Sequence, residues 1–373
     1  MRTAARWAPL LAVRQAAMGA ALGAALLSAC GTPAPSAPAA APPAASPPPA
    51  APYDGPEPWP LAAGEVLGRG ERLLIYLPRP GDQLPAIAAR FLGSADRQWQ
   101  IAEANGLQPA QATALPAGQP LVVPLMSGNS IGVRAGEFQT VPILCYHRFG
   151  NGNNKMVMSP SNFAAQLDWL ARNNYSVIRL GKLAGFLAGR EALPARSVVI
   201  TIDDGYESVH RHAFPLLKKY GFPATLFVYT DFIGSNDGLS WSQLQEMAGS
   251  GLVDIQAHSK SHRNLVERNP GETDERYRQN IETELRAPRE LLERRLGQAK
   301  VQVRHFAYPF GDASDVVLDT MARQHYQLGV TVNPGGNGFY AQPTMLRRTM
   351  IFGDLDLEGF KSKLQTSRSL SAP

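Results

Sequence analysis

Short apolar runs alternate with amphipathic segments over residues 138–366, and this alternation constrains the fold more than any other feature of the chain. The runs are rich in β-branched and aromatic residues and end at turn residues, which is typical of buried strands. Such strands are expected at 141–146, 176–180, 197–202, 224–230, 252–257, 303–308, 327–332 and 346–351. Helix-like stretches lie between them at 160–173, 207–220, 240–250, 272–297 and 314–325. Seven or eight such β/α units predict an α/β fold with a closed or nearly closed barrel.

Two adjacent aspartates, Asp203 and Asp204, stand directly after the apolar run SVVITI of residues 197–202. Carboxylates are rarely left inside a protein without a partner. The pair therefore indicates a cation, a proton or a binding site at the end of this strand. In α/β barrels the chemistry gathers at the carboxyl ends of the strands, which is where these two residues are expected.

Two histidines, His258 and His262, follow another apolar run, GLVDIQA of residues 251–257. Imidazoles four residues apart face the same way if the intervening residues form one helical turn. Two imidazoles and one carboxylate form a three-ligand metal set that leaves a position open for water. Either pattern alone also fits a structural role, because Asp and Gly favour turns. Their joint occurrence after two predicted strands favours a catalytic metal site.

Three motifs make residues 140–352 similar to the NodB-homology polysaccharide deacetylases, carbohydrate esterase family 4. The first motif, TFDDG, stands at Thr201–Gly205 as TIDDG. The second, H-[ST]-x-x-H, stands at His258–His262 as HSKSH, and the third at Phe306–Gly311 as FAYPFG. The stretches VPILCYHRF, YGFPATLFV and LSWSQLQEM agree with the family as well. The resemblance implies a distorted (β/α)7-type barrel and a metal-dependent N-deacetylase over residues 138–366.

The resemblance also implies roles for the residues of the site. Asp204, His258 and His262 would bind a divalent metal ion, expected to be zinc. Asp203 would stay unligated as the general base that takes a proton from the attacking water. The ion and the backbone N–H near Phe310 would stabilise the oxyanion. Residues expected to contact the substrate are Tyr206, Tyr308 and Pro309.

The amine that leaves in this reaction must receive a proton, and the residue that supplies it differs from that of many relatives. Those relatives use a histidine late in the chain. Here no histidine follows His325. The pair Tyr146-His147 instead matches a subgroup that includes deacetylases of poly-N-acetylglucosamine. His147 is therefore the expected general acid, and a strand-end histidine bonded to the backbone is the alternative.

The partner of the general base is a second departure. Ala307 stands where many relatives carry an arginine near this base. Arg348, or Arg347 beside it, is expected to restrain Asp203 from a neighbouring strand. His305 precedes Phe306 in a predicted strand and is expected to point away from the site, because strand side chains alternate.

Residues 71–127 form a second, smaller pattern that predicts a βααβ domain, with β-type runs at 73–77 and 121–125. Between them, Leu84, Ile87 and Phe91 stand at helical spacing. The segments PGD, ANG and PAGQ within this stretch resemble a LysM module. That resemblance implies binding of glycans that contain N-acetylglucosamine, such as peptidoglycan. The alternative is a spacer domain that has lost its ligand.

The N-terminal residues 1–29 have the layout of a secretory signal, with three arginines before an apolar run too short to span a membrane comfortably. The run ends in LSAC and resembles the lipobox of bacterial lipoproteins, which implies lipidation of Cys30. Gly31, rather than Asp, then implies an outer-membrane anchor facing the periplasm. An ordinary cleavable signal is the alternative. Residues 31–60 hold 12 prolines and 9 alanines, so residues 30–70 are expected to form an extended tether.

Charge and cysteine content exclude some partners. Loss of the three signal arginines from the formal charge of +5 leaves about +2, too little to indicate nucleic acid. With Cys30 lipidated, only Cys145 remains and no intramolecular disulfide is expected. The oligomeric state is not predicted. The leading hypothesis is an N-deacetylase of a glycan that contains N-acetylglucosamine. The LysM-like module favours peptidoglycan, the pair Tyr146-His147 favours poly-N-acetylglucosamine, and peptidoglycan is preferred of the two. One alternative is an inactive wall-binding lipoprotein. The other is a glycosidase, which the adjacent pair Asp203 and Asp204 fits poorly, because glycosidase carboxylates lie at least about 5 Å apart on opposite sides of the scissile bond.

Overall fold

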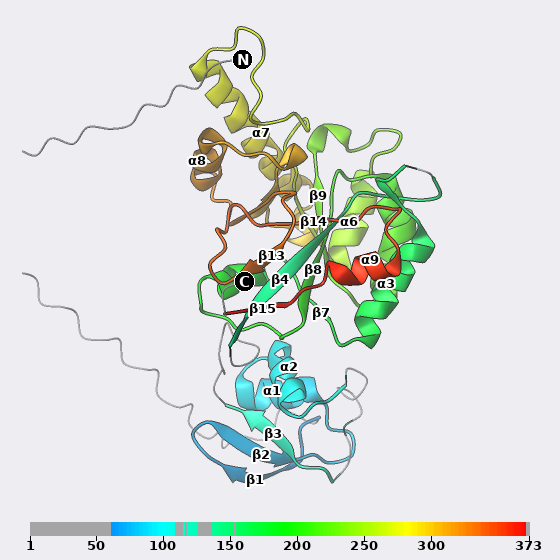
Figure 1. Ribbon diagram of the computed structural model, residues 1–373, viewed down its shortest axis with the longest axis vertical. Helices are drawn as coiled ribbons and strands as arrows, with labels where there is room; N and C mark the ends of the chain where they lie inside the picture. Colours follow the sequence, from blue (N-terminus) through cyan, green and yellow to red (C-terminus); the bar gives the residue numbers. More distant parts are fainter. Residues whose placement is uncertain (1–60, 109–114, 116–117, 126–135, 153, 371–373) are drawn as a thin grey trace, which may run out of the picture. The chain divides into compact units, whose positions relative to one another are not determined.

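The computed structural model describes residues 61–108, 115, 118–125, 136–152 and 154–370 (Figure 1). The predicted signal peptide, Cys30 and the Pro/Ala-rich segment up to residue 60 lie outside the described residues. Within the part that is described, no helix has the length and apolar character that a membrane span requires.

The smaller domain is an antiparallel sheet covered by two helices. Its strands are β1 (Glu65–Arg69), β2 (Leu73–Leu77) and β3 (Leu121–Pro124), in the order β1-β2-β3. Its helices are α1 (Leu84–Leu92) and α2 (Gln98–Ala104), joined by the turn η1 (Ala95–Arg97). The predicted βααβ elements are present. Strand β1 is an addition, because the sequence pattern placed its residues in the tether.

A buried carboxylate fixes the turn between β2 and α1. Asp82 accepts a hydrogen bond from the Tyr76 hydroxyl at 2.7 Å and others from the backbone N–H groups of Ala63, Gly64 and Arg79. A buried carboxylate is tolerated when its oxygens are satisfied in this way. This network ties the segment before β1 to the α1 end of the domain.

The larger domain is a curled parallel sheet. In the described residues its seven parallel strands are β4 (Glu137–Tyr146), β8 (Ser197–Ile202), β9 (Ala224–Val228), β10 (Val253–Ala257), β11 (His305–Ala307), β12 (Leu328–Val330) and β14 (Thr349–Met350). Their order is β12-β11-β10-β9-β8-β4, and β14 pairs with β4 on its other side. Leu346 also forms a parallel bridge with Val330 of β12. The segment 346–350 therefore joins both edges of the sheet, and the predicted distorted (β/α)7-type barrel is confirmed.

Shorter strands extend this sheet. β13 (Gly336–Gly338) and β15 (Ser367–Ser369) pair antiparallel with β4, and β7 (Ser176–Val177) pairs parallel with β8. β5 (Arg148–Phe149) pairs with β6 (Val157–Met158) just beyond the end of β4.

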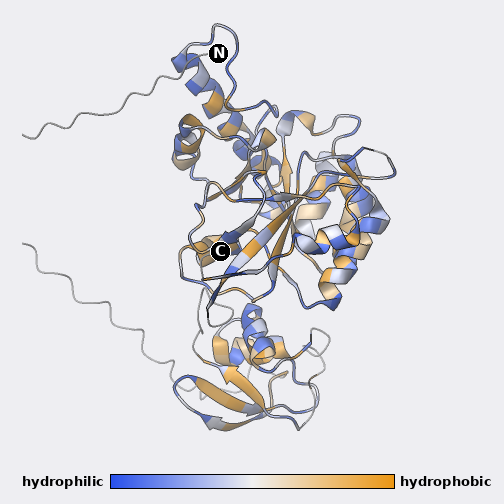
Figure 2. Ribbon diagram, viewed as in Figure 1, coloured by the Kyte–Doolittle hydropathy of each residue, from blue (hydrophilic) through white to orange (hydrophobic). Residues whose placement is uncertain are grey.

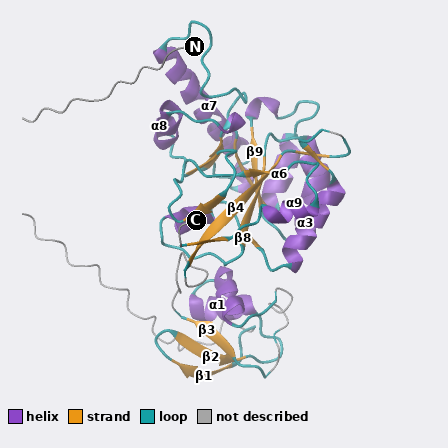
Figure 3. Cartoon of the chain, viewed as in Figure 1, coloured by secondary structure: helices purple, strands orange, loops and turns teal. Residues whose placement is uncertain are grey.

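Helices surround the strands (Figure 3). They are α3 (Pro160–Arg172), α4 (Lys182–Leu187), α5 (Phe214–Tyr220), α6 (Trp241–Gly249), α7 (Asp274–Arg295), α8 (Asp315–Arg323) and α9 (Leu357–Ser362). Several begin at a hydroxyl cap, which satisfies a backbone N–H that has no partner within the helix. Ser159 caps α3, Ser240 forms a capping box on α6, and Thr273 caps α7.

In the larger domain, the alternation of side chains along the strands produces two apolar clusters. Figure 2 shows that the strands consist mostly of hydrophobic residues. In β8, Val198, Ile200 and Ile202 belong to a large cluster shared with the helices. Val199 belongs to a second cluster inside the barrel, together with residues such as Phe227 and Val330. Residues two apart share a face of a strand. The inward row of β8 is therefore 199, 201 and 203, which directs Asp203 into the mouth of the barrel.

Candidate active site

Asp203 is the first residue beyond β8, and its backbone N–H still donates to the carbonyl of Tyr146 at 2.9 Å. Asp204 then turns the chain with a φ of 73°, a left-handed conformation that costs free energy for a residue other than glycine. The turn separates the directions of the two side chains. Neighbouring carboxylates thereby reach different partners in one site.

A buried arginine holds Asp203. The two terminal nitrogens of Arg348 donate to the two carboxylate oxygens, each at 2.7 Å, and Arg348 is fully buried. Its Nε donates to the carbonyl of Thr331 at 2.8 Å. Such a fork-shaped pair fixes the orientation of the carboxylate. The sequence predicted that either Arg347 or Arg348 restrains Asp203. In the structure Arg348 does so, whereas Arg347 is exposed.

The pKa of Asp203 reflects two opposing effects. Burial raises the pKa, but the charge of Arg348 and then that of His258 lower it, and the net value lies below the ordinary range. The carboxylate is therefore ionised at neutral pH and able to accept a proton. A pair of charges in this environment is stable only while both partners remain.

Cys145 is a further neighbour of the base. Its Sγ donates to Oδ2 of Asp203 at 3.6 Å from inside the barrel. Burial raises the pKa of this thiol well above its ordinary value. Because the thiolate is the nucleophilic form, Cys145 is an unreactive thiol here, as expected for a cysteine inside a strand.

Asp204, His258 and His262 converge on one point. Oδ1 of Asp204 lies 3.2 Å from Nε2 of His262 and 3.5 Å from Nε2 of His258. Two ligands at about 2.0–2.1 Å from a tetrahedral ion are roughly 3.3 Å apart. Among the described residues no hydrogen bond reaches this buried Oδ1. A buried oxygen without a hydrogen bond, facing two ring nitrogens at ligand spacing, fits a metal ion.

A backbone carbonyl of the neighbouring strand orients His258. Its Nδ1 lies 2.7 Å from the carbonyl of Ala307 and donates to it, which leaves Nε2 as the free ligand atom. Ala307 belongs to β11, the strand next to β10 in the sheet. The pairing of these two strands therefore selects the tautomer that a metal ion requires.

The loop between the two histidines differs from the expected helical turn. Ser259 has a φ of 68° and His262 a φ of 62°, so the loop is a strained turn rather than a helix. The hydroxyl of Ser259 accepts a hydrogen bond from the backbone N–H of His262 at 2.9 Å. The two imidazoles still converge, with ring centroids 4.8 Å apart. Strained backbone of this kind occurs at functional sites.

Glu284 of α7 holds the same loop, and the sequence patterns did not identify it. Its carboxylate accepts hydrogen bonds from the backbone N–H groups of Lys260 and Ser261, both at 2.9 Å, and from the Ser261 hydroxyl at 2.7 Å. Glu284 is buried, unlike most glutamates on a surface helix. A glutamate at a core-facing position of a charged helix is the one signal that would have indicated it.

His147 lies beside the base. One of its ring nitrogens, an oxygen of Asp203 and the sulfur of Cys145 lie within 4.8 Å of one another. Burial lowers the pKa of His147, Asp203 and Asp204 partly offset this effect, and the net value lies below the ordinary range. A lowered pKa makes the protonated imidazole a stronger acid, although a smaller fraction carries the proton at neutral pH.

Phe310 lies beside the metal ligand His262. It has a φ of 61° and is 60% exposed, and its ring centroid lies 5.1 Å from that of His262. The left-handed conformation sets the direction of the backbone at this position.

Two of the three predicted substrate contacts are buried. Tyr308 is fully buried and its hydroxyl donates to the carbonyl of Thr344 at 2.6 Å, so its side chain cannot reach a substrate. Pro309 is also buried and belongs to the turn that presents Phe310. The alternation of β11 explains the difference, because it directs Tyr308 into the core. Tyr206 is half-buried and remains available.

A continuous row of aromatic side chains lies beside the metal ligands, and two of its members, Tyr229 and Phe232, were not singled out by the sequence patterns. The His262 and Tyr229 rings are 5.0 Å apart, Tyr229 stacks on Phe232 at 5.0 Å, and Phe232 meets Tyr206 edge-on at 5.3 Å. Tyr229 and Phe232 follow β9, the strand between β8 and β10. Their position just after a strand end was the available signal.

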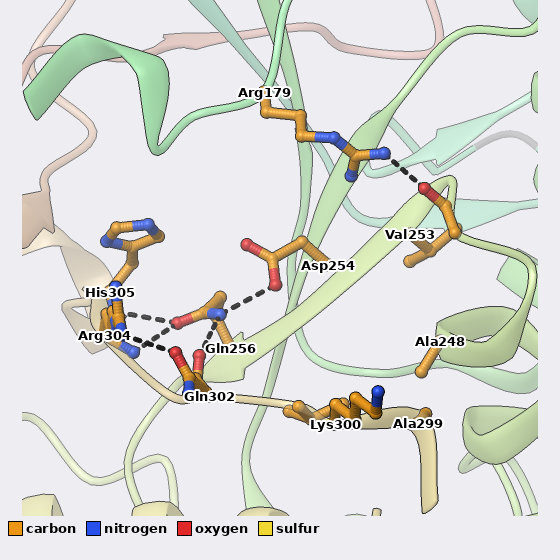
Figure 4. A pocket seen from close by; sticks show the side chains of 12 residues that line it. Arg179, Ala248, Val253, Asp254, Gln256, Ala299, Lys300, Gln302, Arg304 and His305 are labelled. Carbon is orange, nitrogen blue, oxygen red and sulfur yellow. Dashed lines mark hydrogen bonds between the residues drawn. The ribbon is translucent and has the colours of Figure 1, made fainter. Parts of the chain in front are cut away.

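A separate pocket near the opposite ends of β10 and β11 contains His305 (Figure 4). Gln256 bridges the pocket, donating to Asp254 and accepting from the backbone N–H of His305, at 2.9 and 2.8 Å. His305 is buried, and burial lowers its pKa to about 4. His305 begins β11, whereas the metal ligands follow strand ends, so this pocket is not part of the candidate active site. The expected alternation is not the reason, because His305 lies on the same strand face as Ala307, which packs inside the barrel.

Known families match both domains. The polysaccharide deacetylase family matches residues 190–329, and the LysM domain family matches residues 79–124. The Bacillus subtilis protein YxkH, named for the polysaccharide deacetylases, is 31% identical over 218 residues, which cover 57% of this chain and 73% of that protein. The poly-beta-1,6-N-acetyl-D-glucosamine N-deacetylase of Staphylococcus aureus strain MRSA252 is 27% identical over 193 residues, covering 49% of this chain and 65% of that enzyme.

Solved structures resemble the chain as well. The Streptococcus pyogenes deacetylase PplD, in complex with acetate, has a TM-score of 0.54 and 26% identity, covering 61% of this chain and 98% of that one. IcaB from Ammonifex degensii has a TM-score of 0.53 and 28% identity, and the match covers 61% of this chain and 98% of that one.

Proposed function

This chain belongs to the polysaccharide deacetylase family, and from that premise we propose that it removes N-acetyl groups from a glycan of N-acetylglucosamine with the help of a divalent metal ion. The observation that carries the proposal is the approach of Nε2 of His258 and of His262 to one unbonded, buried oxygen of Asp204. Zinc is the ion that this donor set favours, since two imidazoles and one carboxylate leave a position open. Bound there, the ion supplies Lewis acidity for the acetamide carbonyl and lowers the pKa of the attacking water.

Asp203 is the general base of this proposal. Its carboxylate is ionised, held by Arg348 and directed into the mouth of the barrel. It takes a proton from the water that attacks the N-acetyl carbon. Because Arg348 donates to both oxygens, the base is fixed in one orientation before the substrate arrives.

His147 and Phe310 complete the reaction. His147 donates a proton to the nitrogen that leaves as an amine, and its lowered pKa strengthens it as an acid. The backbone N–H at Phe310 donates to the oxyanion that develops on the carbonyl oxygen. The exposed Phe310 ring beside His262 packs against the substrate sugar.

The polymer is proposed to be poly-N-acetylglucosamine. The similarity to the Staphylococcus enzyme named for that glycan and the pair Tyr146-His147 support this choice. The LysM-matching domain favours peptidoglycan as a second candidate. Acetate release from the two polymers, measured side by side, distinguishes them.

The proposed reaction is tested with Asp203→Asn. Wild-type protein should release acetate from N-acetylglucosamine oligomers and stop when a chelator is added. The variant should keep its metal ion and lose activity by about 10²-fold or more, because it lacks the base. Acetate release that persists in the variant would remove Asp203 from the mechanism, and release that persists with a chelator would remove the metal ion.

We also propose that Cys30 carries a lipid that anchors the chain in the outer membrane, facing the periplasm. The LSAC sequence, Gly31 and the Pro/Ala-rich segment that follows support this location. Cys30→Ala should abolish incorporation of labelled palmitate and release the protein from the membrane fraction. A variant that stays in that fraction without label would contradict the anchor.

A further inference from the structure

A groove adjoins the candidate active site and has no role in the reaction described above. Three segments line it, and it encloses about 530 Å³. The lining residues are 148–151, 154 and 157 in the first segment, 206–208, 211 and 212 in the second, and 236–237 in the third. We call it the Arg148 groove. Small-molecule sites occupy about 300–1,000 Å³, so this volume accommodates a ligand of that class.

The groove is next to the reacting groups along two segments of the chain. Arg148 directly follows His147, and Tyr206 comes two residues after Asp204. The row of rings from Tyr206 through Phe232 and Tyr229 then reaches His262. Adjacent residues and this row of rings thus connect the groove to the metal ligands.

Backbone hydrogen bonds tie the segments of the groove together. The N–H of Glu207 donates to the carbonyl of Asp237 at 2.7 Å, and Tyr206 forms an antiparallel bridge with Gly238. The N–H of Phe149 donates to the hydroxyl of Ser208 at 3.1 Å. The groove is thus pre-formed, and a ligand does not have to order it.

The charged side chains of the groove form two ion pairs, and an aromatic ring lies beside one of them. Arg148 pairs with Asp237 at 3.0 Å, and Arg211 pairs with Glu207 at 2.8 Å. The guanidinium of Arg148 lies over the Tyr206 ring, 4.9 Å from its centroid. Two cations matched by two anions give no preference for a polyanion. Many donors and acceptors beside an aromatic face suit an uncharged ligand with several hydroxyl groups.

We propose that the Arg148 groove binds the neighbouring sugar of the glycan, the one adjacent to the sugar that loses its acetyl group. The proposal rests on the proposed function, since it takes the polymer as substrate. Arg148 and Asp237 bind hydroxyl groups of this sugar, and the Tyr206 ring lies against it. Binding energy from a sugar that does not react then contributes to kcat/KM, so that oligomers are better substrates than the single sugar.

The test compares acetate release from N-acetylglucosamine and from its tetramer. In wild-type protein the kcat/KM for the tetramer should exceed that for the monomer. Arg148→Ala and Asp237→Ala should each lower this tetramer-to-monomer ratio about tenfold, mainly through KM, and Arg148→Lys should restore part of it. Arg172→Ala is the matched control, because Arg172 forms an exposed pair with Asp168 on α3, outside the groove. Thermal unfolding of each variant verifies that it is folded.

A binding measurement separates this inference from the proposed function. The tetramer is titrated into metal-loaded Asp203→Asn protein, with and without Arg148→Ala. A tenfold weaker tetramer affinity in the double variant supports the groove. Unchanged affinity, or an unchanged tetramer-to-monomer ratio in both alanine variants, overturns it. Wild-type protein that releases no acetate from any glycan overturns the proposed function, whereas the binding data still decide the groove.

Discussion

At the scale of the residue, the site depends on side chains and backbone held in costly conformations. Among the described residues seven non-glycine residues have a positive φ, and four of them belong to the site: Asp204, Ser259, His262 and Phe310. Each such conformation costs of order 1–2 kcal/mol. That cost is concentrated where ligand atoms and a backbone N–H must point in fixed directions, which is the pattern expected of a pre-organised site.

The pairing of Arg348 with Asp203 gives the first prediction. Arg348→Lys keeps the charge but loses the two-pronged contact, so turnover should fall about 10²-fold while the bound metal stays. The pKa of Asp203 should rise as part of the arginine's effect is lost, and the acid limb of the kcat/KM profile should move to higher pH. Arg347→Ala, at the exposed neighbouring position, is the control. Unaltered turnover in Arg348→Lys would show that catalysis does not require the two hydrogen bonds from the guanidinium to Asp203.

At the scale of the element, helices and strands orient the metal ligands from outside the motifs. Helix α7 places Glu284 under the loop of residues 258–262, and β11 places the carbonyl of Ala307 against His258. Such outer contacts commonly change metal affinity by 10–100-fold. Neither contact is encoded within the H-x-x-x-H motif itself.

The contact from α7 gives the second prediction. Glu284→Gln should weaken metal binding on the order of tenfold, because an amide oxygen accepts fewer and weaker hydrogen bonds than a carboxylate. Competition with a metal-sensitive dye measures the affinity. Glu290→Gln changes an exposed glutamate on the same helix and should leave it unchanged. Equal affinities in Glu284→Gln and wild type would limit Glu284 to a role in packing.

The beginning of β11 gives a prediction about pH. Burial lowers the pKa of His305 to about 4, whereas it is about 6.5 in an unfolded chain. Between these values the unfolded chain binds more protons, so stability is lost as the pH falls from about 6.5 to about 4, by about 3 kcal/mol. Urea unfolding of His305→Gln should lack this part of the pH dependence, whereas His325→Asn, at an exposed position, should retain it. Identical slopes for His305→Gln and wild type would contradict the prediction.

At the scale of the whole molecule, closure of the barrel assembles the site. The segment 346–350 meets both β12 and β4, and this closure brings Arg348 to Asp203 across 145 residues of sequence. The metal ligands come from the ends of β8 and β10, with β9 between them. An ion bound by these ligands stabilises only the folded chain, in which they are together.

Removal of the metal ion therefore gives a prediction for the intact protein. A chelator should lower the Tm of the larger domain by about 5–10 °C when the free ion had been present at 100 times its Kd. Asp203→Asn should show the same shift, because Asp203 is not a ligand, whereas His262→Ala should show almost none. A Tm that is insensitive to chelator in wild-type protein would contradict metal binding by this site.

The sequence alone determined the fold class, most of the strand and helix positions of the barrel and the residues that converge on the metal site. These features are encoded locally: a strand reveals itself by its apolar run, and a ligand by its position just past the end of that run. The tertiary structure decided which arginine pairs with Asp203, that Tyr308 faces the core, and that Glu284 and the Arg148 groove adjoin the site. Those features depend on strand parity and on contacts between segments far apart in the chain. A shift of one residue in the register of a strand would turn every side chain of that strand to the opposite face, and the sequence pattern does not reveal such a shift.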